Sequence, residues 1–378
     1  MTNAAALRQD LAAALAARGQ LTDPAWRAAV EEVPRELFLG AAFYRPHGTQ
    51  WEPVRREDLG EDEWLRLAYS DTTWVTQVDG VDATDSPGPR RPGRPTSSST
   101  LPSLVMRTIE LAGLRDGDKV LEIGTGTGYS TAILSHRLGG RNVYSVEYDE
   151  RLAALAADRI RAAGGSPNLV TGDGLQGHGP GAEYDAVIAT CSVRSVPPSW
   201  LFQLRDGGSI TTTISGWMLA SGMIRLTLDD EGVVRGRFTG DAVSYMLARP
   251  HERPPHPSFF PHPGKSRPTR VSPALLDRWT GHFVAQLAAP SAQLLRLGDD
   301  VMLLDVATGS QAWTEPEGNG WAVHQNGPLN LWDQVEDALM TWQEAGSPDQ
   351  TSFGMTVTDL NQIVWLGHPE GPCWRLPS

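Results

Sequence analysis

The chain has 378 residues, more than one average domain needs, and a formal net charge of −13. Hydrophobic residues make up 40% and charged residues 20%, and no apolar run approaches the roughly 18 residues that a membrane-spanning helix requires. Two cysteines exclude a disulfide framework and a four-ligand zinc site of the usual spacing. We therefore expect a cytoplasmic protein with at least two parts, no membrane segment and no bound metal.

The first 100 residues begin with helical patterns and then lose them. Residues 4–18 carry an apolar stripe interrupted by charges, which predicts a folded helix rather than a secretory signal. Asp23-Pro24 is a typical helix start, and the second helix should end at Val33 before a proline. Residues 41–100 show little periodicity and many Pro, Gly, Asp and Arg residues, so we predict an irregular segment that covers the active site.

From residue 101 onward, apolar segments of strand length alternate with segments of helical spacing. The predicted helices are 101–114, 130–138 and 150–163, and the predicted strands are 119–123, 142–146, 168–171, 184–189 and 209–214. This alternation predicts an α/β fold with a parallel sheet flanked by helices. Ligands of such sheets bind at the carboxyl ends of the strands.

The remainder of the chain changes in character. Residues 249–273 hold eight prolines, which predicts a linker, and helices and a hairpin beyond it predict a C-terminal α+β extension. We therefore divide the chain into four parts: N-terminal helices and covering segment (1–100), cofactor-binding core (101–248), Pro-rich linker (249–272) and substrate-recognition extension (273–378).

The acidic excess lies mainly at the C-terminal end. Residues 271–378 contain three basic and thirteen acidic residues. Such a charge repels nucleic-acid backbones and attracts a cationic partner, although a solubilising surface explains it equally well. We expect no nucleic-acid partner and a monomer.

A glycine-rich turn follows the first core strand and opens a helix, which is the setting of a nucleotide-binding motif. A dinucleotide fingerprint, G-x-G-x-x-G, would place its third glycine at position 129, where this chain has tyrosine. The spacing G-x-G-x-G instead matches the first motif of class I methyltransferases, whose ligand is S-adenosyl-L-methionine. The candidate cofactor residues of this turn are Glu122, Gly124, Thr125, Gly126, Gly128 and Tyr129.

Acidic residues end the next two core strands. Glu147 is placed to accept hydrogen bonds from both ribose hydroxyls, and Asp173 can accept one from the adenine amino group. Each alone could be an ordinary strand end or turn. Their order favours a nucleoside site, to which we add the adjoining Tyr148, Gly174 and Thr190.

Several ordered blocks resemble the protein-L-isoaspartate O-methyltransferase family. They are V-P-R-E-L-F (33–38), A-Y-S-D (68–71), L-E-I-G-T-G-T-G-Y (121–129) and G-D-G-L-Q-G (172–177). The resemblance implies a class I (Rossmann-like) methyltransferase. It also implies transfer of a methyl group to a carboxylate, with S-adenosyl-L-homocysteine as the product.

The resemblance has two local departures. Where the family usually has I-S-x-P, with the serine beside the substrate carboxylate, this chain has Ser99-Thr100-Leu101-Pro102. We expect the hydroxyls of Ser98, Ser99 and Thr100 to orient the acceptor, and a helix N-cap is an equally good explanation of Thr100. The usual T-A-A after the fourth core strand is Thr190-Cys191-Ser192.

The extension of about 100 residues beyond the linker suggests a finer resemblance. It resembles that of actinobacterial family members that act on ribosomally made precursors of lanthipeptides, lasso peptides, graspetides or imiditides. That resemblance implies esterification of a precursor aspartate, which closes to a succinimide (aspartimide) and then opens to isoaspartate. The partner would be the precursor peptide, cationic if the acidic extension binds it. The alternatives are a repair enzyme for L-isoaspartate and a non-catalytic peptide-binding module.

Overall fold

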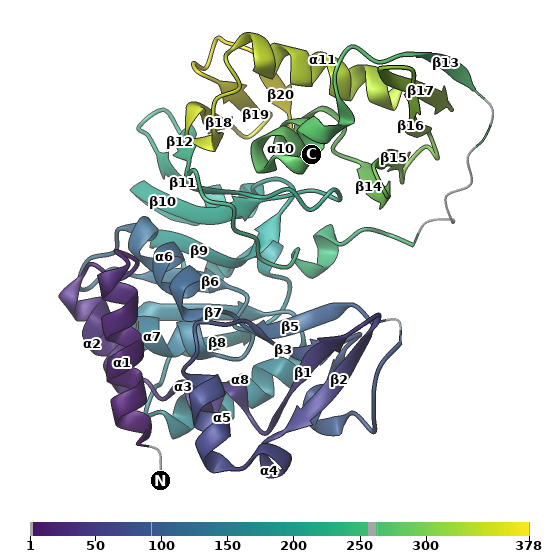
Figure 1. The fold of residues 1–378 in the computed structure, drawn as a ribbon. Helices are drawn as coiled ribbons and strands as arrows, with labels where there is room; N and C mark the ends of the chain where they lie inside the picture. The colour runs from purple at the N-terminus through teal and green to yellow at the C-terminus, as the bar shows by residue number, and fades with distance from the viewer. Residues whose placement is uncertain (1–2, 92, 256–261, 263, 378) are drawn as a thin grey trace. The chain divides into compact units, whose positions relative to one another are not determined.

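A computed structural model describes residues 3–91, 93–255, 262 and 264–377 of this chain (Figure 1). It divides into two compact units. The first unit consists of Met1–Cys191 and Ser199–Thr211, and the second of Ser192–Pro198 and Thr212–Ser378. The chain therefore passes between the units more than once.

The first unit opens with the helices α1 (Ala4–Ala17), α2 (Pro24–Glu32) and α3 (Arg35–Leu39). The Asp23 side chain accepts a hydrogen bond from the Ala25 amide at 2.8 Å, and Pro24 occupies the first turn. The first two predicted helices are confirmed. Their apolar faces, which include Leu15 and Trp26, are buried in the core of the unit.

The prediction of an irregular segment at 41–100 is wrong. A five-stranded sheet forms there, with the order β2-β1-β3-β4 and β5 paired to β3. Its elements are β1 (Ala42–His47), β2 (Gln50–Arg55), α4 (Arg56–Leu59), α5 (Glu61–Ala68), β3 (Trp74–Val78), β4 (Val81–Asp82) and β5 (Pro95–Ser99). The strands are short and contain prolines, and β3 pairs with β5 across about 20 residues, so local periodicity does not reveal the sheet.

The core of the first unit is the predicted parallel sheet. Its order is β8-β7-β6-β9-β10, and β6 runs parallel to both β7 and β9. The strands are β6 (Val120–Ile123), β7 (Val143–Glu147), β8 (Asn168–Thr171), β9 (Tyr184–Val193) and β10 (Leu204–Ile214). The helices are α6 (Pro102–Ala112), α7 (Tyr129–Leu138), α8 (Glu150–Ala162) and α9 (Pro198–Leu201). All four side chains of β6 are buried, as expected for a strand covered on both faces.

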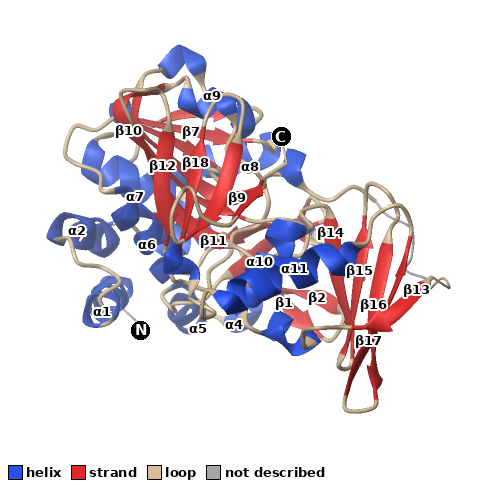
Figure 2. Ribbon diagram, turned by 90° about the horizontal axis from the view of Figure 1, so that it is seen from above, coloured by secondary structure: helices blue, strands red, loops and turns tan. Residues whose placement is uncertain are grey.

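The second unit contains two sets of antiparallel strands and two long helices (Figure 2). One set has the order β11-β12-β18-β19-β20, and the other has the order β13-β17-β16-β15-β14. The first comprises β11 (Gly222–Leu228), β12 (Val234–Phe238), β18 (Phe353–Val357), β19 (Gln362–Leu366) and β20 (Cys373–Arg375). The second comprises β13 (Lys265–Pro268), β14 (Ala292–Leu297), β15 (Asp300–Asp305), β16 (Gln311–Glu317) and β17 (Gly320–Asn326). Helices α10 (Trp279–Ala288) and α11 (Leu331–Glu344) pack against each other, and α11 contacts β15, β16 and β17.

These units do not follow the four parts drawn from the sequence. Strands β11 and β12, which lie within 101–248, belong to the second unit because β12 pairs with β18. Strand β13 lies within the expected linker and pairs with β17. Residues 256–261 and 263 of that linker lie outside the described residues.

The charge is also distributed differently from our expectation. The first unit holds 20 basic and 27 acidic residues, and the second holds 12 and 18. Arg267 and Arg270, just before the counted stretch, form ion pairs with Glu336, whose side chain is fully buried. The acidic excess is therefore shared by the two units.

Candidate functional site

The glycine-rich turn connects β6 to α7 and is held by the strands on both sides. The amide of Gly124 donates to the carbonyl of Val146 in β7 at 2.8 Å. The hydroxyl of Thr190 in β9 donates to the carbonyl of Gly124 at 2.5 Å. Gly124, Gly126 and Gly128 have φ values of 96°, 56° and 95°, which glycine adopts most readily. The turn therefore has one fixed conformation, as a ligand-binding backbone requires.

The three glycines serve different purposes. A Cβ added to Gly126 would meet no atom closer than 4.0 Å, so the backbone is open there. A Cβ on Gly128 would lie 3.1 Å from Ile160 Cγ1, and one on Gly124 would lie 3.0 Å from Thr190 Oγ1. The expectation that Gly128 makes room for a ligand is therefore wrong. It permits α8 to pack closely, and Gly126 provides the open position.

Glu147 links the end of β7 to this turn. One carboxylate oxygen accepts from the Gly126 amide at 2.8 Å and the other from the Asp149 amide at 3.0 Å. The side chain is 8% exposed, so its orientation is largely fixed. Each oxygen retains a lone pair that a ribose hydroxyl can use. Tyr148, the next residue, is 54% exposed.

Asp173 and Gly174 follow β8 and join the same group of residues. The amide of Gly172 donates to the carbonyl of Glu147 at 2.8 Å, and Asp173 Oδ1 accepts from the Leu175 amide at 2.9 Å. A Cβ on Gly174 would lie 2.5 Å from Ile123 Cγ2, so only glycine fits there. The structure thus brings the ends of β6, β7, β8 and β9 together by direct contacts.

Glu122 and Tyr129 lie in the core rather than on the open side of the turn. The Glu122 carboxylate is fully buried and accepts from Thr131 Oγ1 at 2.5 Å and Ser145 Oγ at 2.7 Å. Burial raises its pKa, although these hydrogen bonds oppose the shift. Ser145 also bonds the hydroxyl of Thr125 at 2.7 Å. We therefore interpret Glu122 as a support for the turn, not as a direct ligand.

Tyr129 has a similar supporting position. It is 4% exposed, and its ring centroid lies 5.8 Å from that of Phe38. Burial raises the pKa of its phenol to about 12, so it is neutral at physiological pH. Its substitution for a third dinucleotide-type glycine thus has a packing role.

Arg35 is a site residue that the candidate set omitted. It is 1% exposed, and burial lowers its pKa to about 10. Its guanidinium donates to the carbonyls of Ser70, Thr72 and Thr100 at 2.9, 2.9 and 3.1 Å, and also to those of Ala68 and Ser99. It therefore fixes the A-Y-S-D segment and the end of β5 relative to each other. The available signal was the arginine of the V-P-R block.

The N-cap explanation of Thr100 is wrong. Leu101 occupies the cap position of α6, without a side-chain hydrogen bond. The first amides of this region are satisfied from elsewhere: Asp71 accepts from Ser103 N at 2.9 Å and Thr73 accepts from Leu101 N at 3.0 Å. Within the described part of the chain, the Thr100 hydroxyl has no hydrogen-bond partner.

The other two candidate hydroxyls differ from each other. Ser99 is 1% exposed and its hydroxyl is buried without a partner, and Ser98 is half-buried on β5, paired with Val75. Cys191 lies beside the glycine turn, with its sulfur 3.8 Å from the Ile123 carbonyl. Burial raises the pKa of this thiol to about 12, so it is protonated at neutral pH. Among the described residues there is no group of three His, Cys, Asp or Glu side chains that could hold a metal, and no helix long and apolar enough to span a membrane.

Known proteins share both the sequence and the fold. The model of the family Protein-L-isoaspartate(D-aspartate) O-methyltransferase (PCMT) matches residues 50–232. A protein-L-isoaspartate O-methyltransferase of Ignicoccus hospitalis is 32% identical over 203 residues, covering 53% of this chain and 78% of that protein. One of Pyrobaculum neutrophilum is 34% identical over 224 residues, covering 58% of this chain and 96% of that protein.

A solved structure named protein-L-isoaspartate O-methyltransferase matches with a TM-score of 0.56 and 20% identity. It covers 96% of this chain and 100% of its own. Likeness at that identity concerns the fold alone, but it includes the second unit. The extension is therefore not a feature peculiar to peptide-tailoring enzymes, which removes our main reason for that finer assignment.

The predicted fold class, α/β with a parallel sheet flanked by helices plus a strand-rich C-terminal region, is confirmed. The enzyme class is confirmed as well, a carboxyl O-methyltransferase that uses S-adenosyl-L-methionine. On the length and identity of these matches, the chain belongs to the protein-L-isoaspartate O-methyltransferase family.

Proposed function

We propose that this protein methylates the free α-carboxylate of L-isoaspartyl residues in peptides or proteins. The observation that carries the proposal is the group of contacts around Gly126 and Glu147, in a chain whose family acts on that carboxylate. The same unit holds Ser99 and Thr100 in a fixed segment through Arg35. A cofactor site and an acceptor segment are thus both built into the first unit.

The residues present fit S-adenosyl-L-methionine. Gly126 leaves the backbone open, and the Glu147 carboxylate is held by two amides with lone pairs to spare for ribose hydroxyls. Asp173 and Tyr148 lie at the ends of the adjoining strands, where an adenine ring would be recognised. When bound, the cofactor supplies an electrophilic methyl group and leaves as S-adenosyl-L-homocysteine.

The protein's part in the reaction is orientation and exclusion of water. An isoaspartyl α-carboxylate has a pKa far below 7 and is ionised at neutral pH, so no general base is needed. A carboxylate oxygen forms the new C–O bond while the bond from methyl to sulfur breaks. The unpartnered hydroxyl of Thr100 can donate to the other carboxylate oxygen and so hold it in line. The protonated thiol of Cys191 does not compete as a nucleophile.

The ester then reacts without further help from the enzyme. The backbone nitrogen of the following residue attacks the ester carbonyl, methanol leaves, and a succinimide forms. Water opens the ring to aspartate and isoaspartate. Repeated cycles therefore convert isoaspartate to aspartate, which is a repair of the damaged backbone.

Modification of an ordinary aspartate in a dedicated precursor peptide is the second candidate. It is favoured by the replacement of the family's usual residues by Thr100, Cys191 and Ser192, which alter the acceptor surroundings. A non-catalytic peptide-binding module is disfavoured by the complete set of Gly126, Glu147 and Asp173 contacts.

Mass spectrometry of candidate substrates tests these functions. The enzyme and S-adenosyl-L-methionine are incubated separately with an isoaspartyl peptide and with precursor-like peptides that contain only aspartate. We expect a gain of about 14 mass units, one methylation, on the isoaspartyl peptide alone. Methylation of an aspartyl precursor in preference would support the second candidate. Failure to bind S-adenosyl-L-homocysteine in calorimetry would instead support the non-catalytic module.

A further inference from the structure

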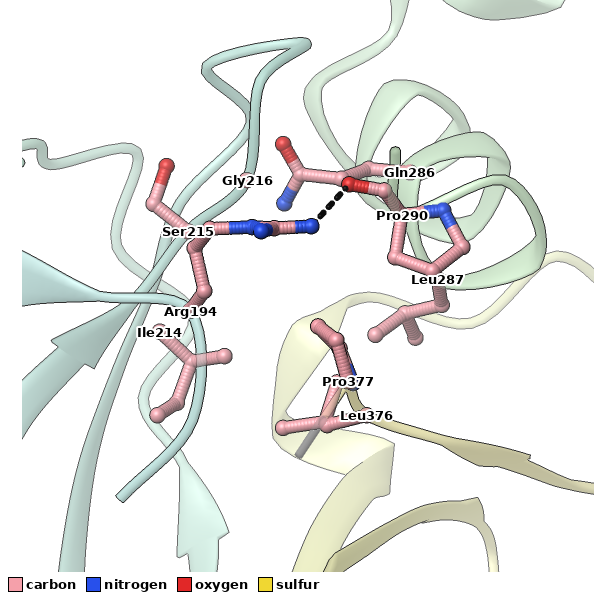
Figure 3. A pocket seen from close by; sticks show the side chains of 9 residues that line it. All are labelled: Arg194, Ile214, Ser215, Gly216, Gln286, Leu287, Pro290, Leu376 and Pro377. Atoms are coloured by element: carbon pink, nitrogen blue, oxygen red, sulfur yellow. Dashed lines mark hydrogen bonds between the residues drawn. The ribbon is translucent and has the colours of Figure 1, made fainter. Parts of the chain in front are cut away.

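A pocket in the second unit combines an apolar wall with one cation (Figure 3). It encloses about 230 Å³, part of which is open to solvent. Its apolar wall consists of Ile214, Leu287, Pro290, Leu376 and Pro377. No other arginine and no lysine lines it among the described residues, so Arg194 is the sole full charge.

Gln286 also lines this pocket, but its amide group is already used. It accepts from the Ala220 amide at 3.1 Å and donates to the Ala220 carbonyl at 2.5 Å. The side chain is 3% exposed, which makes it a rigid part of the wall. Recognition of a polar ligand therefore depends mainly on Arg194.

The guanidinium of Arg194 is held in place by neutral groups. Its Nη2 donates to the Pro290 carbonyl at 3.0 Å, the contact drawn in Figure 3, and its Cζ lies 3.8 Å from the centroid of the Trp217 ring. Trp217 is fixed in turn by a hydrogen bond from Nε1 to the carbonyl of His251. His251 Nδ1 accepts from the Arg194 amide at 3.0 Å. The cation is therefore pre-oriented.

The charge of Arg194 has no close counter-ion. In the described part of the chain no carboxylate lies within 4.0 Å of it, and neither Nε nor Nη1 has a hydrogen-bond partner. Burial lowers its pKa, and Asp305 opposes this from a greater distance. Arg35 contrasts with it, because Arg35 donates to five backbone carbonyls. A partly buried arginine with unused donors is suited to bind an external anion.

We propose that this pocket binds a second carboxylate of the peptide substrate, one that flanks the methylated residue and has an apolar neighbour. This inference rests on the proposed function. Guanidinium groups pair well with carboxylates, and the apolar wall can hold the neighbouring side chain. A phosphate would call for further cations. Arg194 follows Thr190 by four residues, at most about 14 Å of extended chain, so we expect the second carboxylate within about four residues of the first.

Matched peptides test this directly on the wild-type enzyme. Each contains one isoaspartyl residue and, three positions away, either glutamate or glutamine beside a leucine. We expect kcat/KM to be about tenfold higher for the glutamate peptide, the ratio that ~1.4 kcal/mol produces. The Arg194→Met variant should bring this ratio close to one, and Arg194→Lys should give an intermediate ratio. Arg235→Met, which removes an exposed arginine of the same unit, should leave the ratio unchanged.

Binding separates this proposal from the proposed function. The affinity of both peptides is measured by calorimetry in the presence of S-adenosyl-L-homocysteine, whether or not either is methylated. Tighter binding of the glutamate peptide, lost in Arg194→Met, supports the pocket even if methylation fails. Equal binding of the two peptides by the wild-type enzyme, or a preference that persists in Arg194→Met, would overturn it.

Discussion

The Nη2 atom of Arg35 donates to the backbone carbonyl of Thr100 at 3.1 Å. This contact joins a buried arginine of the N-terminal helices to the segment expected to orient the substrate. The same guanidinium holds the carbonyls of Ser70 and Thr72. The position of the Thr100 hydroxyl therefore depends on a residue that need not touch the substrate.

Replacement of Arg35 should damage both stability and activity. Arg35→Met leaves several buried carbonyls without donors, so we expect the free energy of unfolding to fall by about 3 kcal/mol or more. Arg35→Lys should fall less, because it keeps the charge but has fewer donors. Urea unfolding measures both. Arg66→Met, at an exposed ion pair, should change stability by less than about 1 kcal/mol. A loss as small in Arg35→Met would contradict the role given to this residue.

Alanine at Gly126 and at Gly128 should have different consequences. Gly128→Ala forces a methyl group against Ile160, so we expect a stability loss of about 2 kcal/mol or more. Gly126→Ala meets open space and should cost about 1 kcal/mol for its left-handed backbone. It should, however, weaken binding of S-adenosyl-L-homocysteine more strongly. Unfolding and calorimetry on both variants check this, and the same variant being worse in both measurements would refute the division of roles.

Glu147→Gln should weaken cofactor binding. The variant loses the negative charge and one of the two acceptors that Gly126 and Asp149 now use. We expect the dissociation constant for S-adenosyl-L-homocysteine to rise about tenfold or more, since hydrogen bonds to charged groups contribute about 1.5–3 kcal/mol. Glu150→Gln, an exposed neighbour, is the matched control. Equal affinities of the two variants in calorimetry would exclude Glu147 from the cofactor site.

The buried carboxylate of Glu336 should make the second unit sensitive to acid. Burial alone would raise its pKa, but hydrogen bonds from Arg267, Thr269 and Arg270 outweigh burial and lower it to about 2. Because the folded pKa lies below the unfolded value, the stabilisation is present at neutral pH and is lost as pH falls from about 4.5 towards 2.

Glu336→Gln measures that stabilisation. The variant should be less stable than the wild type by about 3 kcal/mol at pH 7, and the difference should shrink on acidification. Denaturant unfolding at several pH values follows it, with Glu344→Gln as an exposed control. A difference that does not change between pH 7 and pH 3 would show that the loss is not due to the charge.

Much of the first unit was predictable because its signals are local. The helix start at Asp23-Pro24 and the alternation from residue 101 depend on spacing and capping within short windows. The sheet formed by β1–β5 was missed because its pairings join short, proline-containing strands. Trp332 and Trp342, expected to hold a peptide, are at most 2% exposed and belong to the core, which the sequence does not distinguish from a binding surface.

The candidate site shows the same limit. Spacing located Gly126, Glu147 and Asp173 correctly at the ends of adjoining strands. It did not separate these from Glu122 and Tyr129, whose side chains turn into the core, because neighbouring residues of a strand or turn face opposite ways. Arg35 could be assigned only once its distant carbonyl partners were known.

Competition between two isomeric peptides tests the central claim most directly. The peptides have one sequence and differ only in whether the residue before a glycine is aspartate or isoaspartate. They are mixed in equal amounts with enzyme and isotope-labelled S-adenosyl-L-methionine, and the labelled ester on each is measured after chromatography. The account predicts ester on the isoaspartyl peptide and its progressive conversion to the aspartyl form. Equal labelling of both peptides, or labelling of the aspartyl peptide alone, would contradict it.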